Sequence, residues 1–66
     1  MKIFVNGQGQ ELAEGLNASG LIEQMGLTGQ RLAMEVNEEI VPRSIFDQHI
    51  FQDGDRVEIV HAVGGG

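Results

Sequence analysis

The sequence predicts one α+β domain, in which a mixed sheet of about five strands is crossed on one face by a single helix. Three observations predict this class. Apolar and polar residues alternate near both ends of the chain, and one capped segment between them has helical spacing. The length of 66 residues allows one small core and no second domain. We expect the first and last strands to be parallel neighbours at the centre of the sheet.

The chain begins with an amphipathic strand and a hairpin turn. Alternate residues of Met1–Val5 share the inner face, which places Phe4 on the outer face. Residues 6–9, with the sequence Asn-Gly-Gln-Gly, predict a hairpin turn, because two of these residues accept a positive φ at low cost. A short return strand is expected over residues 10–13, with Leu12 as its inward anchor.

The helix is predicted to follow Asn17, a favourable N-cap because its side-chain oxygen can accept an unpaired backbone N–H. Gly26 is expected to end it in the left-handed conformation, with Leu27 folding back in a Schellman motif. Gly20 inside the helix should cost ~1 kcal/mol relative to alanine, and close packing on the sheet is its expected reason. The apolar stripe consists of Ala18, Leu21, Ile22 and Met25.

Three further strands are predicted in the second half of the chain. Residues 32–36 alternate in polarity, and residues 40–41 form a short strand that ends at Pro42, since proline cannot donate a ladder hydrogen bond. Ser44 is expected to cap a single helical turn. The last strand is predicted over residues 56–63.

This order of elements is the β-grasp arrangement. Residues 1–63 are expected to form the β-grasp domain, and residues 64–66 a flexible tail of three glycines. Backbone without side chains can thread a narrow channel, so Gly64 and Gly65 would give access to the terminal carboxylate of Gly66. The tail is therefore a candidate reactive segment, and an inert disordered terminus is the alternative.

Composition and spacing argue against several function classes. The net charge of −6 argues against nucleic-acid binding, which needs clustered cations. No apolar run approaches the ~20 residues that span a bilayer, and the start is too soon polar for a signal peptide. We therefore expect a cytoplasmic protein that does not bind membranes.

Catalysis by the chain itself is not expected either. There is no cysteine, and therefore no thiolate nucleophile or zinc–thiolate site. His49 and His61 lack a third ligand at metal-binding spacing, and no nucleophile is placed beside a base. Neither an intrinsic cofactor nor a metal site is predicted.

A partner-binding surface is predicted on the outer face of the sheet. Phe4 and Val60 should point outward from neighbouring central strands and form a contiguous patch with Ala62, leading to Val63 and the tail. Phe51 is expected to extend this apolar surface. Because the helix covers the other face, this one needs a cover or a partner, although single exposed hydrophobic residues are ordinary.

Several segments, at both ends of the chain and between them, resemble segments of known proteins. Met1–Val5 resembles the start of ubiquitin, and Gly65-Gly66 matches the terminal diglycine of ubiquitin-like proteins. Residues 35–37, 40–43 and 54–66 carry the strongest resemblance. They are similar to the ThiS family of sulfur carriers in thiamine biosynthesis, which are ubiquitin-like proteins. Together the resemblance covers nearly all of the chain.

The resemblance implies a chemistry for the tail. An E1-like adenylyltransferase of the ThiF type would transfer AMP from ATP to the Gly66 carboxylate, using ATP and magnesium that belong to that enzyme. Sulfur from a persulfide on a donor protein would then replace AMP. The resulting thiocarboxylate would give its sulfur to a thiazole synthase of the ThiG type. Two alternatives stay open: the small subunit of molybdopterin synthase, and a ubiquitin-like modifier or interaction module.

Overall fold

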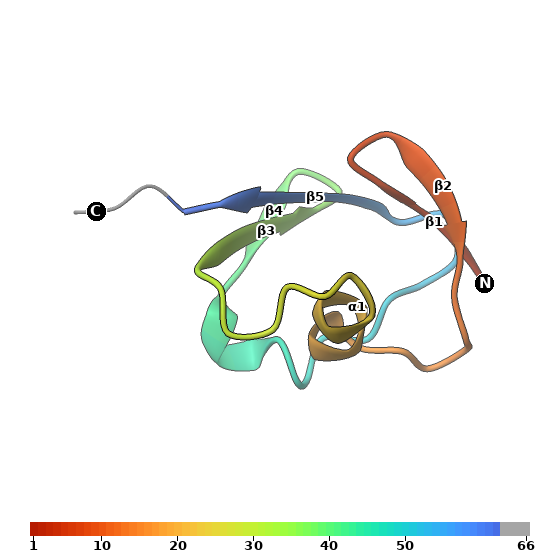
Figure 1. The fold of residues 1–66 in the computed structure, drawn as a ribbon. Helices are drawn as coiled ribbons and strands as arrows, with labels where there is room; N and C mark the ends of the chain where they lie inside the picture. The colour runs from red at the N-terminus through yellow and green to blue at the C-terminus, as the bar shows by residue number, and fades with distance from the viewer. Residues whose placement is uncertain (63–66) are drawn as a thin grey trace.

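The computed structural model describes residues 1–62, which form one five-stranded sheet with a helix packed across one face (Figure 1). The strand order is β2-β1-β5-β3-β4. The central pair β1 and β5 is parallel, and the other neighbours are antiparallel. The predicted fold class and the parallel central pair are confirmed. The elements are β1 (Lys2–Val5), β2 (Gln8–Glu11), α1 (Ala18–Gln24), β3 (Leu32–Val36), β4 (Glu39–Val41), the 3-10 turn η1 (Arg43–Ile45) and β5 (Arg56–His61).

Two tight turns with positive φ join the antiparallel pairs. Asn6 and Gly7 have φ of 50° and 84° between β1 and β2, and Asn37 and Glu38 have φ of 53° and 72° between β3 and β4. These values are typical of the two-residue turns that match strand twist. Because the first turn takes only two residues, β2 begins two residues before the predicted segment 10–13.

Both predicted signals at the ends of α1 are confirmed. The Asn17 Oδ1 atom accepts a hydrogen bond from the Gly20 backbone N–H at 2.7 Å. At the other end Gly26 has φ 74°. Its N–H donates to the Glu23 carbonyl, and the Leu27 N–H donates to the Ile22 carbonyl, both at 3.0 Å. This pair of bonds is the Schellman motif.

Glycine occurs at position 20 because of neighbouring side chains in the sequence, and not because of the close packing on the sheet that was expected. A Cβ atom on Gly20 would lie 2.6 Å from Leu16 Cδ1 and 3.1 Å from the capping Asn17 Oδ1. Leu16 packs against the buried core at this point. Glycine therefore leaves room for the residue that precedes the cap.

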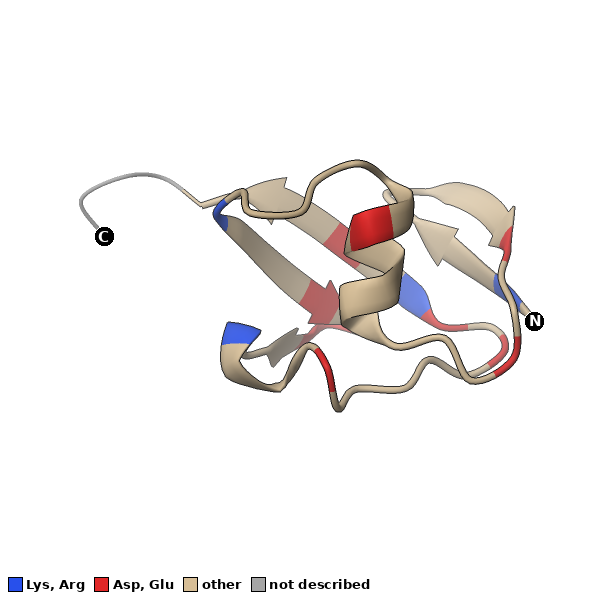
Figure 2. Cartoon of the chain, turned by 60° about the horizontal axis from the view of Figure 1, so that its bottom comes forward, with Lys and Arg blue, Asp and Glu red and all other residues tan. Residues whose placement is uncertain are grey.

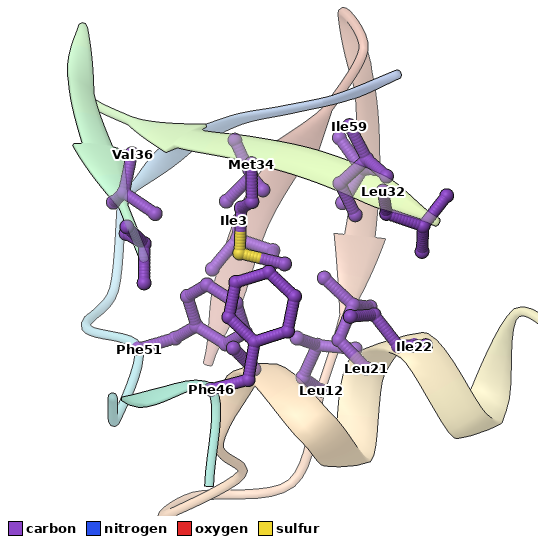
Figure 3. Close-up of a cluster of buried hydrophobic side chains, with 14 residues drawn as sticks. Ile3, Leu12, Leu21, Ile22, Leu32, Met34, Val36, Phe46, Phe51 and Ile59 are labelled. Carbon is purple, nitrogen blue, oxygen red and sulfur yellow. The ribbon is translucent and has the colours of Figure 1, made fainter. Parts of the chain in front are cut away.

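The core lies between the sheet and α1, with contributions from β1, β3, β4, β5 and the segments that follow β2 and η1 (Figure 3). Met34, Phe46 and Leu21 converge in its middle. The prediction that Ser44 caps the short turn is wrong. Ser44 lies inside η1, whose N-cap residue is Pro42 and whose start has no side-chain cap.

Within residues 1–62, no helix has the length and apolar character needed to cross a bilayer. Figure 2 shows the basic segments dispersed over the chain, without a basic cluster in this view. Ten acidic residues stand against four Lys and Arg residues.

Candidate functional site

The central strand β5 is the base of the candidate site, because it leads to the glycine segment. Backbone hydrogen bonding continues one residue beyond the end of β5, because the Ala62 N–H donates to the Arg31 carbonyl at 3.0 Å. His61 Nε2 hydrogen-bonds Gln30 Oε1 at 2.5 Å. The chain is therefore fixed, as far as Ala62, to the segment that precedes β3. The predicted reactive residue Gly66, the access residues Gly64 and Gly65, and the predicted contact residue Val63 lie outside the described residues.

Two asparagine side chains fix β5 to the rest of the fold. The Asn6 amide donates to the Ile59 carbonyl at 3.1 Å and accepts from the Ile59 N–H at 2.9 Å. The Asn37 side chain accepts from the Arg56 N–H at 2.9 Å and donates to Asp55 Oδ1 at 3.0 Å. The sequence predicted that Asn6 lies in a turn, and in the structure both asparagines also hold β5. The second role was not predicted, because it depends on a strand more than fifteen residues away.

The outer face of the sheet exposes Phe4 and Val60, whose side chains are 39% and 59% exposed. Ala62 is also exposed. The parallel register sets Phe4 opposite Arg56, four residues before Val60. At ~3.3 Å per residue this corresponds to about 13 Å along the strand.

The expected contiguous patch is therefore two separate apolar areas. Glu58 lies between them on the same face of β5. Val60 is instead opposite the exposed Ala33 of β3. This second area is the one next to Ala62 and the start of the tail.

The predicted extension of this surface by Phe51 is wrong. Phe51 is 3% exposed, and its ring meets the His49 ring edge-on with centroids 5.5 Å apart. Figure 3 shows it pointing into the core together with Phe46. The neighbouring Ile50 takes the outward position and is 51% exposed.

The surroundings of Phe4 are acidic. A hollow of about 560 Å³ on the outer face is lined by Phe4 together with Glu35, Glu38, Glu58 and Arg56. Glu35 and Glu58 are direct cross-strand partners, an arrangement that is unfavourable for like charges. Lys2 Nζ lies 5.6 Å from the centre of the Phe4 ring. This area can attract a cationic side chain, whereas the Val60 area is apolar.

Groups that could hold a metal do not gather within residues 1–62: no three His, Asp or Glu side chains come together there. His61 is bound to Gln30 on the β3 side, and His49 is packed on Phe51 beside the core. The described part of the chain thus contributes a rigid strand and exposed surfaces to the candidate site. The reacting group proposed from the sequence remains the terminal carboxylate.

Comparisons with known proteins agree on one family. The model of the ThiS family matches residues 3–66. The sulfur carrier protein ThiS of Escherichia coli (strain K12) is 36% identical over 66 residues, which are 100% of both chains. The crystal structure of the thiamine biosynthesis protein ThiS from Geobacter metallireducens superposes with a TM-score of 0.85 at 33% identity, with both chains fully covered.

Two longer relatives are thiazole synthases. Those of Paramagnetospirillum magneticum and Magnetococcus marinus are 36% and 33% identical to this chain over 66 residues. The match takes in 100% of this chain but only 20% of each synthase. The chain thus spans about a fifth of the length of these relatives.

Proposed function

The chain belongs to the ThiS family, and on this premise we propose that it is a sulfur carrier of thiamine biosynthesis that holds the sulfur as a thiocarboxylate on Gly66. The observation that carries the proposal is that this chain matches a sulfur carrier protein over its full length at 36% identity. The last strand of the chain also leads into three glycines. The β-grasp domain then serves to present the tail to partner enzymes.

The proposed chemistry begins with activation of the carboxylate, which is a poor electrophile at neutral pH. A Gly66 carboxylate oxygen attacks the α-phosphorus of ATP, and pyrophosphate leaves. ATP and magnesium are bound by the activating enzyme, of the ThiF type. The terminal sulfur of a donor persulfide then attacks the acyl carbon and AMP leaves, which gives an acyl disulfide. A thiol reduces the disulfide bond, so that a disulfide forms and the thiocarboxylate is released.

This chain contributes access and position to these steps. The Asn6 and Arg31 hydrogen bonds hold β5 in place up to Ala62. Glycines beyond that point allow a narrow active-site channel, since they have no side chains. Catalytic groups are supplied by the partners, and the chain acts as a co-substrate.

Phe4, Val60, Ala62 and Val63 are proposed contact residues for these partners. The exposure of Phe4 and Val60 supports this assignment. The two areas are separate and would bind different groups of the partner. The acidic hollow around Phe4 would attract a basic group. The Val60 area would instead pack against apolar side chains near the tail.

The proposed acceptor of the sulfur is a thiazole synthase of the ThiG type. Two thiazole synthases carry a segment similar to this entire chain within one polypeptide, which supports a direct contact between carrier and synthase. This observation favours the thiamine pathway over the small subunit of molybdopterin synthase.

The test is intact-mass spectrometry after incubation with the activating enzyme, ATP, magnesium, a persulfide donor and a thiol. We expect the mass to rise by the difference between one sulfur and one oxygen. Deletion of Gly66 should abolish this gain while leaving the thermal transition unchanged. Glu23→Lys, on the exposed surface of α1, serves as a control variant with an intact tail. Isopeptide conjugates to lysine would instead indicate a modifier, and no mass change would contradict the proposal. Mixing the thiocarboxylate with thiazole synthase and molybdopterin synthase identifies the acceptor.

A further inference from the structure

A second apolar surface lies where β4 meets η1 and the loop that follows η1. Ile40, Ile45 and Ile50 are 76%, 37% and 51% exposed. All three line one hollow of about 320 Å³, which we call the β4–η1 hollow. Isolated exposed hydrophobic residues are ordinary, but several around one hollow mark an interaction surface.

Hydrogen bonds fix the walls of the β4–η1 hollow, although much of it is built from a loop. The His49 N–H donates to the Ile45 carbonyl at 3.0 Å, and Ile50 pairs with Asn17 through an isolated β-bridge. The Asp55 carboxylate accepts hydrogen bonds from the Gln52 N–H at 2.9 Å and from the Asn37 amide. A preformed site loses little conformational entropy on binding, which favours affinity.

The charge of the β4–η1 hollow selects the kind of partner. Its charged lining residues are Glu39 and Asp55, with no lysine or arginine among them. Asp55 is buried and hydrogen-bonded, whereas Glu39 is exposed and forms no ion pair within residues 1–62. Complementary charge therefore calls for a basic partner.

A second copy of this chain fits the β4–η1 hollow poorly. Each copy would bring a net charge of −6, and Glu39 would approach its own counterpart across a symmetric contact. A stable dimer also buries roughly 800 Å² per partner. That is nearly a fifth of the 4385 Å² accessible surface, and three partly exposed isoleucines cannot supply it.

We propose that the β4–η1 hollow is a docking site for a basic partner protein, which inserts one aliphatic or aromatic side chain between Ile45 and Ile50 and sets a lysine or arginine beside Glu39. The hollow involves η1 and the β4 edge, away from Phe4 and Val60 on the two central strands. A carrier that visits several enzymes can then be held on a surface other than the one next to its tail. The choice of enzymes for the test rests on the proposed function.

The test is calorimetric titration of the full chain with the ThiF-type activating enzyme and, separately, with the thiazole synthase of the same organism. The variants are Ile50→Ser, Ile45→Ser and the charge reversal Glu39→Lys. Glu23→Lys is the matched control for the charge reversal, because Glu23 is also an exposed glutamate but lies on α1, outside the hollow and outside the proposed contact residues. The thermal transition of each variant is recorded first, so that only folded variants are compared.

We expect Ile50→Ser and Glu39→Lys each to weaken binding to at least one of the two enzymes by about tenfold or more. Glu23→Lys should change that same affinity by less than about twofold, because Glu23 lies outside the β4–η1 hollow. Unchanged affinity of the three hollow variants for both enzymes would overturn the proposal. Concentration-dependent dimers that Ile50→Ser abolishes would overturn it as well, by assigning the hollow to a second copy.

Thiocarboxylate formation on the same variants separates this proposal from the proposed function. A chain that binds through the hollow but gains no sulfur contradicts the carrier role and leaves the docking site standing. If all variants gain sulfur equally well and bind both enzymes with unchanged affinity, the docking site alone is contradicted.

Discussion

Replacing Asn6 removes a side-chain amide that continues the hydrogen bonding between β1 and β5 beyond the end of β1. Its nitrogen donates to the Ile59 carbonyl at 3.1 Å, and its oxygen accepts from the Ile59 N–H at 2.9 Å. The residue also has φ 50°, which asparagine and glycine tolerate better than other residues. The effect of a substitution therefore has two parts that different variants can separate.

Asn6→Gly keeps the backbone conformation and removes both hydrogen bonds. At about 1 kcal/mol for each, the expected loss is about 2 kcal/mol in the free energy of unfolding. Asn6→Ala adds the left-handed backbone cost of roughly 1 kcal/mol, for a total of about 3 kcal/mol. Asn6→Asp keeps the acceptor for the Ile59 N–H and loses the donor, so it should fall near 1 kcal/mol.

Urea unfolding followed by circular dichroism measures these differences, with the slope of free energy against urea checked for constancy. A loss of about 2 kcal/mol should also lower the midpoint of thermal unfolding by roughly 10 °C in a domain of this size. If Asn6→Gly is as stable as the wild type, the amide does not support β5 and the reasoning is refuted. If Asn6→Ala equals Asn6→Gly, the backbone part is wrong.

Three further predictions concern the helix, the core and the amino terminus. Gly20→Ala gains ~1 kcal/mol of helix propensity but should still destabilise the fold, because the new Cβ would lie 2.6 Å from Leu16 Cδ1. In a Leu16→Ala background the same change should stabilise the fold. If Gly20→Ala stabilises the otherwise unchanged protein, this account is contradicted. Phe51→Ala should cost about 3 kcal/mol or more in urea unfolding, since the side chain is 3% exposed, whereas a surface residue would cost little. The Met1 amino group donates a hydrogen bond to the Glu14 carboxylate, 3.0 Å away, and this bond raises the pKa of the amino group above its ordinary value of 8.0. The contribution of this bond to the stability of the fold is therefore complete below pH 8.0 and is lost as the pH rises through the raised pKa. Glu14→Gln should therefore be less stable than the wild type at neutral pH, with a difference that shrinks in alkaline solution, and a constant difference would count against this linkage.

Local chemistry made much of the fold predictable from the sequence. The Asn6-Gly7 turn, the Asn17 cap and the Gly26 Schellman motif each depend on groups within a few residues of one another. Strand alternation then assigned Phe4 to the outer face, where the structure places it. The Gly66 carboxylate was also proposed from the sequence pattern alone, and this stays a prediction because Gly66 lies outside the described residues.

The misassigned residues depend on contacts between distant segments. Phe51 lies in a loop without periodicity, and it is buried because the loop packs against α1 and the sheet. The separation of Phe4 from Val60 follows from the parallel register, which no local pattern encodes. The helix-propensity cost of Gly20 stays a prediction. The side chain that this glycine accommodates was not predicted, because it depends on where Leu16 lies.

The sequence by itself determined which elements form, where the turns and helix ends lie, and which segment carries the candidate reactive carboxylate. Side-chain identity controls these features through bonds between near neighbours, so the pattern is sufficient. Only the tertiary structure decided that the outer face carries two apolar areas and that the three exposed isoleucines meet at one hollow. Both depend on strand register and loop packing, in which residues far apart in the chain compete for the same core space.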